Sequence, residues 1–222
     1  MSKTEAIAVR LLHWGNTIKA IAQTGLSFTT DYNDKLRYED LLDVATEILA
    51  SVNDNLQFDA KFAQKLAQTL RRETHTGVVG YITPKVSVAA AVFDENDRIL
   101  LVKGNHSKSW SLPGGWAEER WSPAENAQRE VLEETGLIVK ARHLLGVFDS
   151  RLHPFETSIT SYTLLFECQK VGGELNVFHH EIEEAKFFSD DRLPKLITGA
   201  TKQIRVVFAF HKGQPDKPYF DQ

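Results

Sequence analysis

The sequence predicts an α/β domain, with a mixed sheet between helices, preceded by a small all-α helical domain. Two observations support this. Over residues 1–75, apolar side chains recur every three or four positions, which is the period of an amphipathic helix. From residue 84 onward, short apolar runs of strand length lie on either side of one helical segment, and another helical segment follows near the end. We therefore predict domains over residues 1–75 and 84–222, joined by the Gly- and Thr-rich connection Glu73–Pro84.

The composition is that of an ordinary globular protein, with 222 residues, 42% hydrophobic and 25% charged. A net charge of −4 provides no general attraction to nucleic acid or to an anionic membrane. The single cysteine, Cys168, excludes an internal disulfide. The N-terminus does not resemble a signal peptide, and no apolar run has membrane-spanning length. We expect a cytoplasmic protein that binds neither nucleic acid nor membrane.

Three helices are predicted in residues 1–75. The first ends at Gly25 and the others cover residues 41–48 and 58–70; the apolar positions of the first are Ile7, Leu11, Trp14, Ile18 and Ala22. Basic and acidic residues are nearly equal in number here, whereas a DNA-binding module normally presents a basic face. The surplus apolar surface instead predicts self-association, most simply as a homodimer.

The second domain is predicted to begin with a hairpin, because two apolar runs flank the turn at residues 94–97. Strands are predicted over Val86–Phe93, Arg98–Lys103, Trp110–Leu112, Ile138–Asp149, Ser158–Gln169 and Glu184–Phe188, and a final helix over Thr198–Phe210.

The helix in the middle of this domain has signals at both ends. Ser122 is a good N-cap, Pro123 suits the first helical position, and Glu125 completes a capping box. Gly136 predicts a left-handed stop. A Gly-Gly turn at residues 114–115 precedes the helix, and glycine there permits a close approach of the backbone.

Three carboxylates lie on one face of this helix. At about 100° per residue, Glu130, Glu133 and Glu134 fall within an arc of roughly 100°. They repel one another unless a positive charge lies between them, and oxygen ligands suit Mg²⁺ or Mn²⁺. A solvated acidic face is the alternative interpretation. The Gly-Gly turn and the neighbouring Arg129 favour a metal site instead.

This stretch resembles the Nudix box of the Nudix hydrolases, G-x5-E-x7-R-E-U-x-E-E-x-G-U with U aliphatic. The chain matches its fixed positions at Gly115, Arg129, Glu130, Val131, Glu133, Glu134, Gly136 and Leu137. Trp121 stands where the box has its first Glu. The resemblance implies an α/β/α sandwich and a metal-dependent hydrolase of nucleoside diphosphates linked to a second group.

The N-terminal residues carry a second resemblance. Leu12–Trp14, Ala20–Gly25 and Asp34–Tyr38 are similar to the helical module joined to some Nudix hydrolases, among them bacterial ADP-ribose and CDP-choline pyrophosphatases. In those relatives the module is associated with dimer formation.

We assign Glu130 and Glu134 as metal ligands, and Glu133 as a ligand or a bridging carboxylate. The family resemblance adds the backbone carbonyl of Gly115. Glu118 is a further candidate ligand, although a solvated loop carboxylate is nearly as good an interpretation. We expect Arg129 to orient a carboxylate by a bidentate ion pair. The predicted catalytic residues are thus Glu133, Glu134 and Arg129.

Outside the box the sequence leaves alternatives open. The family takes its catalytic base from a later loop, where the candidates are His153, Glu156, Glu181, Glu183 and Glu184. Arg98, Lys103 and Arg151 are candidates for binding a phosphate, although each alone is more often a surface charge. Trp110, Trp116 and Phe148 are candidates for stacking on a base, with core packing as the default. The pair His179–His180 lacks further spaced ligands and predicts no metal site.

The predicted reaction is the hydrolysis of ADP-ribose to AMP and ribose 5-phosphate, with Mg²⁺ or Mn²⁺ as cofactor. The alternatives are a CDP-choline pyrophosphatase and a Nudix-like sensor that binds a nucleotide without cleaving it. Trp121 favours the sensor, and the intact run Arg129–Glu134 favours hydrolysis. We expect Trp121 to anchor the start of the helix by packing against Asn126 or Ala127.

Overall fold

The computed structural model describes residues 3–52, 58–74, 83–152, 160–177, 181–197, 199–214 and 217–222. The chain divides into two compact units, Met1–Thr83 and Pro84–Gln222. Within the described residues, no helix is both long enough and apolar enough to cross a membrane.

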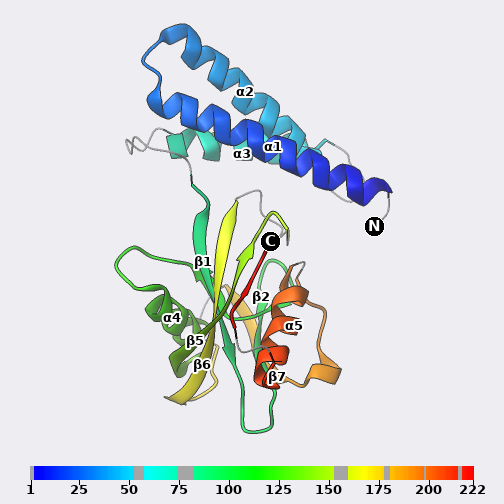
Figure 1. Cartoon of the computed structure of the whole chain (residues 1–222), viewed down its shortest axis with the longest axis vertical. Helices are drawn as coiled ribbons and strands as arrows, with labels where there is room; N and C mark the ends of the chain where they lie inside the picture. Colours follow the sequence, from blue (N-terminus) through cyan, green and yellow to red (C-terminus); the bar gives the residue numbers. More distant parts are fainter. Residues whose placement is uncertain are drawn as a thin grey trace. The chain divides into compact units, whose positions relative to one another are not determined.

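The first unit consists of α1 (Lys3–Phe28), α2 (Tyr32–Ala50) and α3 (Ala60–Thr74), and α1 and α2 run side by side in opposite directions (Figure 1). Asp31 caps α2, because its carboxylate accepts a hydrogen bond of 2.9 Å from the backbone N–H of Asp34. The three helices meet around a small apolar core formed by Ala22, Leu42, Leu49, Leu66 and Leu70.

Gly25 does not end the first helix, so that prediction was wrong. The helix continues to Phe28. Gly25 faces α2 inside this helix, at a point where a Cβ atom would overlap the ring of Tyr38. Gly15 has a similar role, since a Cβ atom there would lie 2.8 Å from Cγ of Leu49. The two glycines therefore let α1 and α2 approach closely, which outweighs their low helical propensity.

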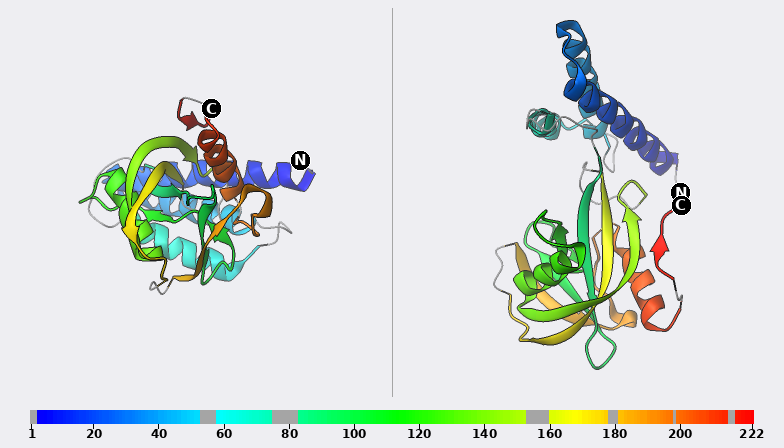
Figure 2. Two further views of the ribbon diagram at one scale, coloured as in Figure 1. Left: turned by 90° about the horizontal axis from the view of Figure 1, so that it is seen from below. Right: turned by 60° about the vertical axis from the view of Figure 1, so that its left-hand side comes forward.

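The second unit contains two sheets and two principal helices (Figures 1 and 2). One sheet has the order β4-β1-β6-β5-β8 and the other the order β3-β2-β7. The five-stranded sheet is mixed: β1 is parallel to β6 and β5 is parallel to β8, whereas β1 is antiparallel to β4 and β5 is antiparallel to β6. The strands are β1 (Lys85–Val92), β2 (Ile99–Gly104), β3 (Trp110–Ser111), β4 (Gly114–Trp116), β5 (Leu137–Asp149), β6 (Ser161–Gly173), β7 (Ile182–Phe188) and β8 (Tyr219–Phe220).

Helices cover both sides of the sheets, which confirms the predicted α/β/α sandwich. Figure 2 shows α4 (Pro123–Thr135) and α5 (Ala200–His211) on opposite sides. Alternate side chains of β1 explain this arrangement. Val88 and Ala90 belong to the core that contains Val131 of α4, whereas Ala89 belongs to the core that contains Ile204 of α5.

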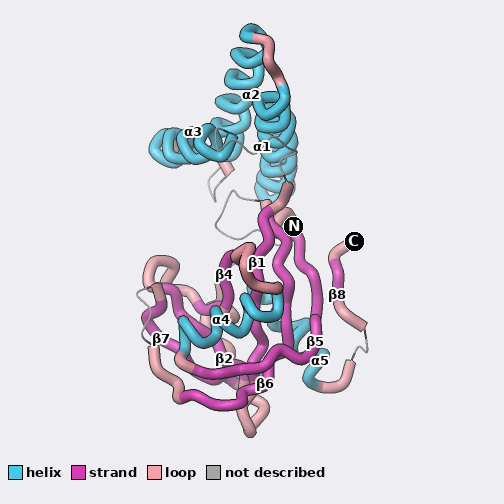
Figure 3. Tube along the Cα trace, turned by 90° about the vertical axis from the view of Figure 1, so that its left-hand side faces the viewer, coloured by secondary structure: helices cyan, strands magenta, loops and turns pink. Residues whose placement is uncertain are grey.

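Two elements in the C-terminal part of this unit were not predicted. A short 3-10 helix covers Asp190–Arg192, and β8 pairs with β5 near the C-terminus (Figure 3). The ring of Tyr219 stacks on Phe148, with 4.9 Å between ring centroids. Phe148 and Trp110 are both buried in the core, as their default interpretation predicted.

Candidate active site

The end signals of α4 form as the sequence predicts. The hydroxyl of Ser122 accepts a hydrogen bond of 3.3 Å from the backbone N–H of Glu125, whose carboxylate accepts one of 2.8 Å from the N–H of Ser122. Gly136 ends the helix with a φ of 73°. These contacts involve near neighbours in sequence, so they set the start and the phase of the helix that carries the acidic residues.

The predicted Gly-Gly turn is instead the short strand β4, so the prediction of a turn was wrong. Neither glycine of β4 is among the residues with positive φ. Glycine is required by close approach, because a Cβ atom on Gly114 would collide with the carbonyl oxygen of Val88 on β1. A Cβ atom on Gly115 would lie 2.8 Å from Oε2 of Glu130. The strand is thus pressed between β1 and the acidic face of α4.

Glu134 links α4 to β4. Its Oε2 accepts a hydrogen bond of 3.0 Å from the backbone N–H of Gly114, and the residue is only 8% exposed. Burial raises the pKa of Glu134 to about 8, opposed by the hydrogen bond from Gly114 and reinforced by the charges of Glu130, Glu181 and Glu133. Burial is also the main reason why the pKa of Glu130 is raised. Burial and the neighbouring carboxylates thus favour the protonated form of both side chains when no cation is present.

Arg129 lies among the remaining carboxylates. Its Nη1 is 2.9 Å from both oxygens of Glu133, and its Nη2 is 2.8 Å from Oε1 of Glu130 and 3.4 Å from Oε1 of Glu118. The Nε of Arg129 is buried without a hydrogen-bond partner among the described residues. One guanidinium thus holds three carboxylates in place.

The donor set has the chemistry that a hard divalent cation prefers, since all its ligand atoms are oxygens. The missing Cβ of Gly115 leaves room for the carboxylate of Glu130, which fits an oxygen-rich site next to the β4 backbone. In the part of the chain that the structure describes, no three acidic, His or Cys side chains already form a ligand set. Glu118, Glu130 and Glu133 face Arg129 instead.

Asn126 organises the loop before α4, a role that the sequence did not reveal. The residue is fully buried, and its Oδ1 accepts a hydrogen bond of 3.0 Å from the N–H of Glu118. Its Nδ2 donates to the carbonyl oxygens of Glu118, Trp121 and Ser122, at 3.1, 3.2 and 3.3 Å. An Asn four residues after an N-cap is the only sequence signal of this role.

Trp121 lies just before the N-cap of α4. The residue is 42% exposed, and its ring lies 5.7 Å from the guanidinium carbon of Arg120. The backbone carbonyl of Trp121 accepts a hydrogen bond from Asn126, which anchors the loop to α4.

Three of the five candidate bases lie within the described residues, and their surroundings differ. Glu181, just before β7, is near enough to Glu130 and Glu134 for its charge to raise the pKa of both. Glu183 instead pairs with Lys103 and Lys108, and Glu184 pairs with Lys103 and Lys186. The candidates His153 and Glu156, and the pair His179–His180, lie outside the described residues.

Each predicted phosphate-binding cation has a carboxylate partner. Arg98 pairs with Asp94 at 2.6 Å, Lys103 lies 3.1 Å from Glu184, and Arg151 pairs with Asp149 at 2.5 Å. Asp94 comes five residues after Ala89, which pairs with Gly114. At about 3.3 Å per residue, Asp94 is roughly 16 Å from Ala89 along the strand direction. Arg98 is thus at the far end of β1 from the acidic residues of α4.

A cavity of about 530 Å³ opens beside β4. Trp116, which is 44% exposed, lines it, as the prediction of a substrate-binding role requires. The other lining residues are Ser87, Val88, Ala89, His106, Ser107, Ser111, Leu112, Gly114, Gly115, Ser161, Thr163, Ile197 and Gln203.

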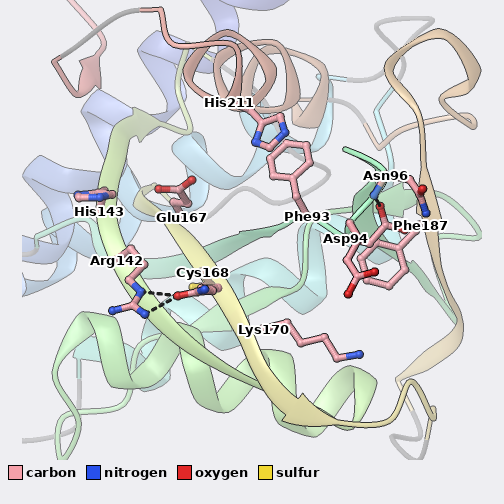
Figure 4. Close-up of a pocket in the computed structure, with 12 residues that line it drawn as sticks. Phe93, Asp94, Asn96, Arg142, His143, Glu167, Cys168, Lys170, Phe187 and His211 are labelled. Carbon is pink, nitrogen blue, oxygen red and sulfur yellow. Dashed lines mark hydrogen bonds between the residues drawn. The ribbon is translucent and has the colours of Figure 1, made fainter.

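A second cavity, of about 1100 Å³, lies between the end of α5, the β1–β2 hairpin and strands β5 and β6 (Figure 4). It shares no lining residue with the first. The ring of His211 stacks on Phe93 at 3.7 Å, and the Nε of Arg142 donates to Gln169 at 2.9 Å. Burial raises the pKa of Cys168 to about 12, so the thiol in this cavity stays protonated.

Comparison with known proteins assigns both parts of the chain to Nudix-related families. Residues 83–210 match the NUDIX domain family, and residues 9–58 match the family described as "UDP-X-like, N-terminal oligomerisation domain". "Putative ADP-ribose pyrophosphatase YjhB" of Bacillus subtilis (strain 168) is 36% identical over 218 residues, which are 97% of this chain and 99% of that protein.

Two further proteins that are similar to this chain also have names of pyrophosphate-cleaving enzymes. The ADP-ribose pyrophosphatase of Methanocaldococcus jannaschii is 33% identical over 136 residues, covering 60% of this chain and 78% of that protein. A crystal structure of UDP-X diphosphatase superposes with a TM-score of 0.59 at 31% identity, covering 96% of this chain and 99% of the other. The chain therefore belongs to the Nudix hydrolases, enzymes that cleave pyrophosphate bonds in nucleoside diphosphate derivatives.

Proposed function

We propose that this enzyme hydrolyses ADP-ribose to AMP and ribose 5-phosphate. The observation that carries the proposal is the meeting of Glu130 and Glu134 with the β4 backbone, beside a cavity of about 530 Å³. The near full-length similarity to "Putative ADP-ribose pyrophosphatase YjhB" supports the choice of substrate.

The cofactor in this proposal is Mg²⁺ or Mn²⁺. The chain would hold it with Glu130, Glu133 and Glu134, together with the carbonyl of Gly115, and Glu118 is the further candidate ligand. When bound, the cation would neutralise diphosphate oxygens and lower the pKa of a water molecule. Nudix hydrolases generally depend on a divalent metal, and the all-oxygen donor set is consistent with this.

The roles proposed for the other side chains follow from their contacts. Arg129 acts as a positioning residue, because its ion pairs hold the carboxylates of Glu130 and Glu133. The N–H of Gly114 holds Glu134 in the same way. Glu181 is our candidate general base, which would accept a proton from the attacking water. Among the described candidates, it is the one whose charge raises the pKa of both Glu130 and Glu134.

The substrate would lie with its diphosphate beside β4 and its base against Trp116. Lys103 and Arg151 remain candidates for binding phosphate, and each would have to exchange a carboxylate partner for the substrate. Arg98 is the weakest of the three because it lies at the other end of β1.

A second candidate substrate class is a UDP-linked compound. The supporting observation is the similarity to UDP-X diphosphatase over 96% of this chain. In this alternative the same acidic residues act on the same pyrophosphate bond, and only the base that the cavity accepts is different.

We also propose a homodimer formed through the N-terminal helices. Ile7, Trp14, Ile21 and Phe28 are exposed on α1 at a spacing of seven residues, which places them on one stripe of the helix. The similarity of residues 9–58 to an oligomerisation domain supports self-association. A cytoplasmic location is proposed as well, which agrees with a single, unpaired and buried cysteine, Cys168.

A substrate panel tests the reaction. Purified enzyme with Mg²⁺ or Mn²⁺ is assayed on ADP-ribose, UDP-glucose, CDP-choline, NADH and diadenosine polyphosphates, with released nucleoside monophosphate as the readout. We expect the highest kcat/KM for ADP-ribose, and no activity after chelation of the metal. A higher kcat/KM on UDP-glucose or CDP-choline would overturn ADP-ribose as the substrate.

A further inference from the structure

The cavity beside β4 has a polar group that the reaction does not use. Gln203 of α5 lines the cavity and is only 3% exposed. Its Nε2 is buried and has no hydrogen-bond partner among the described residues. Buried amide groups are normally hydrogen-bonded, because leaving one unpaired is unfavourable. An unpaired amide at the wall of a cavity therefore suggests a partner on the ligand.

The walls around Gln203 suit a flat ring. Trp116 presents an aromatic side chain to the cavity from β4, and Val88, Leu112 and Ile197 add apolar surface. Ligand pockets typically combine such apolar walls with a few placed polar groups. The base of a nucleotide has this shape and chemistry, since its faces are apolar and its edge forms hydrogen bonds.

The remaining polar groups of the cavity are partly paired with each other. The hydroxyls of Ser87 and Thr163 lie 2.8 Å apart, so one of them donates to the other. This pair leaves one hydroxyl proton for another acceptor. Gln203 is different because its amide nitrogen is left without a described partner.

We propose that Gln203 reads the adenine of the substrate. A glutamine amide offers a donor and an acceptor side by side, which matches the N7 acceptor and the N6 amino donor of adenine. Trp116 packs against the face of the same ring. Gln203 is thus a specificity residue that does not touch the reacting phosphorus. The choice of adenine rests on the proposed function, whereas the choice of residue rests on the cavity.

Binding of nucleoside monophosphates tests this without catalysis. AMP, GMP, CMP and UMP, which lack a pyrophosphate bond, are titrated into wild type and Gln203→Met by isothermal calorimetry. Met preserves the volume and removes the amide. We expect wild type to bind AMP most tightly, and Gln203→Met to bind AMP about tenfold or more weakly, with smaller changes for the other three. Gln203→Glu should weaken AMP binding as well, because a carboxylate cannot donate to N7.

Two controls complete the design. Gln169→Met removes a glutamine from the second cavity and should leave all four affinities unchanged. Trp116→Leu should weaken all four to a similar extent, because stacking does not distinguish bases. Thermal unfolding of each variant verifies that it is folded.

The outcomes separate the two proposals. Wild-type affinity for AMP in Gln203→Met would overturn the role of Gln203, and tighter binding of UMP, CMP or GMP than of AMP by wild type would overturn the assignment of adenine. An enzyme that hydrolyses no ADP-ribose but loses AMP binding with Gln203→Met would overturn the proposed reaction and support this inference.

Discussion

The carboxylate of Glu134 accepts a hydrogen bond from the backbone N–H of Gly114, with 3.0 Å between Oε2 and N. This bond joins the C-terminal half of α4 to β4, twenty residues earlier in the chain. It also holds a mostly buried carboxylate at the point where the acidic residues face the strand. Whatever binds at this site therefore meets a side chain that is already positioned.

Glu134→Gln should lower kcat by at least about a hundredfold and leave the fold intact. The amide keeps an oxygen that can accept the hydrogen bond from Gly114 but loses the negative charge that a cation requires. The measurements are kcat on the best panel substrate and the circular dichroism spectrum. Turnover within twofold of wild type, with an unchanged spectrum, would exclude Glu134 as a metal ligand.

The metal-free enzyme should lose thermal stability as the pH rises from about 4.5 to about 8. The pKa of Glu134 is raised from an ordinary value of 4.5 to about 8 in the folded protein. The contribution of this carboxyl group to the free energy of unfolding is thus fully present below its pKa in the unfolded chain. It is lost as the pH rises through its pKa in the folded protein. Glu130, whose pKa is also raised, acts in the same direction.

Unfolding temperatures measured at several pH values, with EDTA or with Mg²⁺, test this dependence. Glu134→Gln should reduce the slope in EDTA, and the stabilisation by Mg²⁺ should increase with pH because the ligand must lose its proton. A slope in EDTA that is equal in wild type and Glu134→Gln would contradict the role of this carboxyl.

Asn126→Ala should destabilise the protein far more than Trp121→Ala. Asn126 is fully buried and binds the backbone of Glu118, Trp121 and Ser122, so its loss leaves several buried groups unpaired. We expect a decrease in the free energy of unfolding of about 2–4 kcal/mol for Asn126→Ala. Trp121 is 42% exposed, and its replacement should lower this free energy by less than about 1 kcal/mol.

Urea denaturation of the two variants provides the measurement. Turnover should follow the same order, because Asn126 holds the loop that carries Glu118. Equal destabilisation by the two substitutions would mean that the indole ring, and not the Asn126 amide, anchors the loop.

Glu181→Gln should lower kcat by about a hundredfold or more and leave KM nearly unchanged, as expected for loss of a general base. The acidic limb of the pH–rate profile should also change. Glu183→Gln is the matched control, because its carboxylate is held by Lys103 and Lys108. If Glu183→Gln or Glu184→Gln impairs kcat more than Glu181→Gln does, the base has been assigned to the wrong residue.

Ile21→Glu should convert the full-length protein from a dimer to a monomer. The charge falls in the exposed apolar stripe of α1, between Trp14 and Phe28, where burial of a carboxylate would be unfavourable. Light scattering at micromolar concentration gives the molar mass. Gln64→Glu, at an exposed position of α3, is the control and should remain a dimer. A monomeric wild type would refute this assembly.

The sequence by itself determined α4 and the set of acidic residues that it carries. Ser122, Glu125 and Gly136 act through hydrogen bonds and backbone angles within a few residues, so their effect can be read locally. The apolar run Val86–Phe93 likewise predicted a strand, which the structure contains as β1. The helical period of residues 1–75 predicted three helices without information from the rest of the chain.

Only the tertiary structure decided which residues meet across the chain. Gly25 continues a helix because Tyr38 lies against it, and Gly114 is needed because Val88 lies against it. The position of Glu181 relative to Glu130 depends on the separate paths of β7 and α4. Such contacts join segments far apart in sequence, so periodicity and local propensity carry no information about them. The same reason explains why Gln203, an ordinary helical residue in the sequence, was recognised only once α5 had been placed beside the cavity.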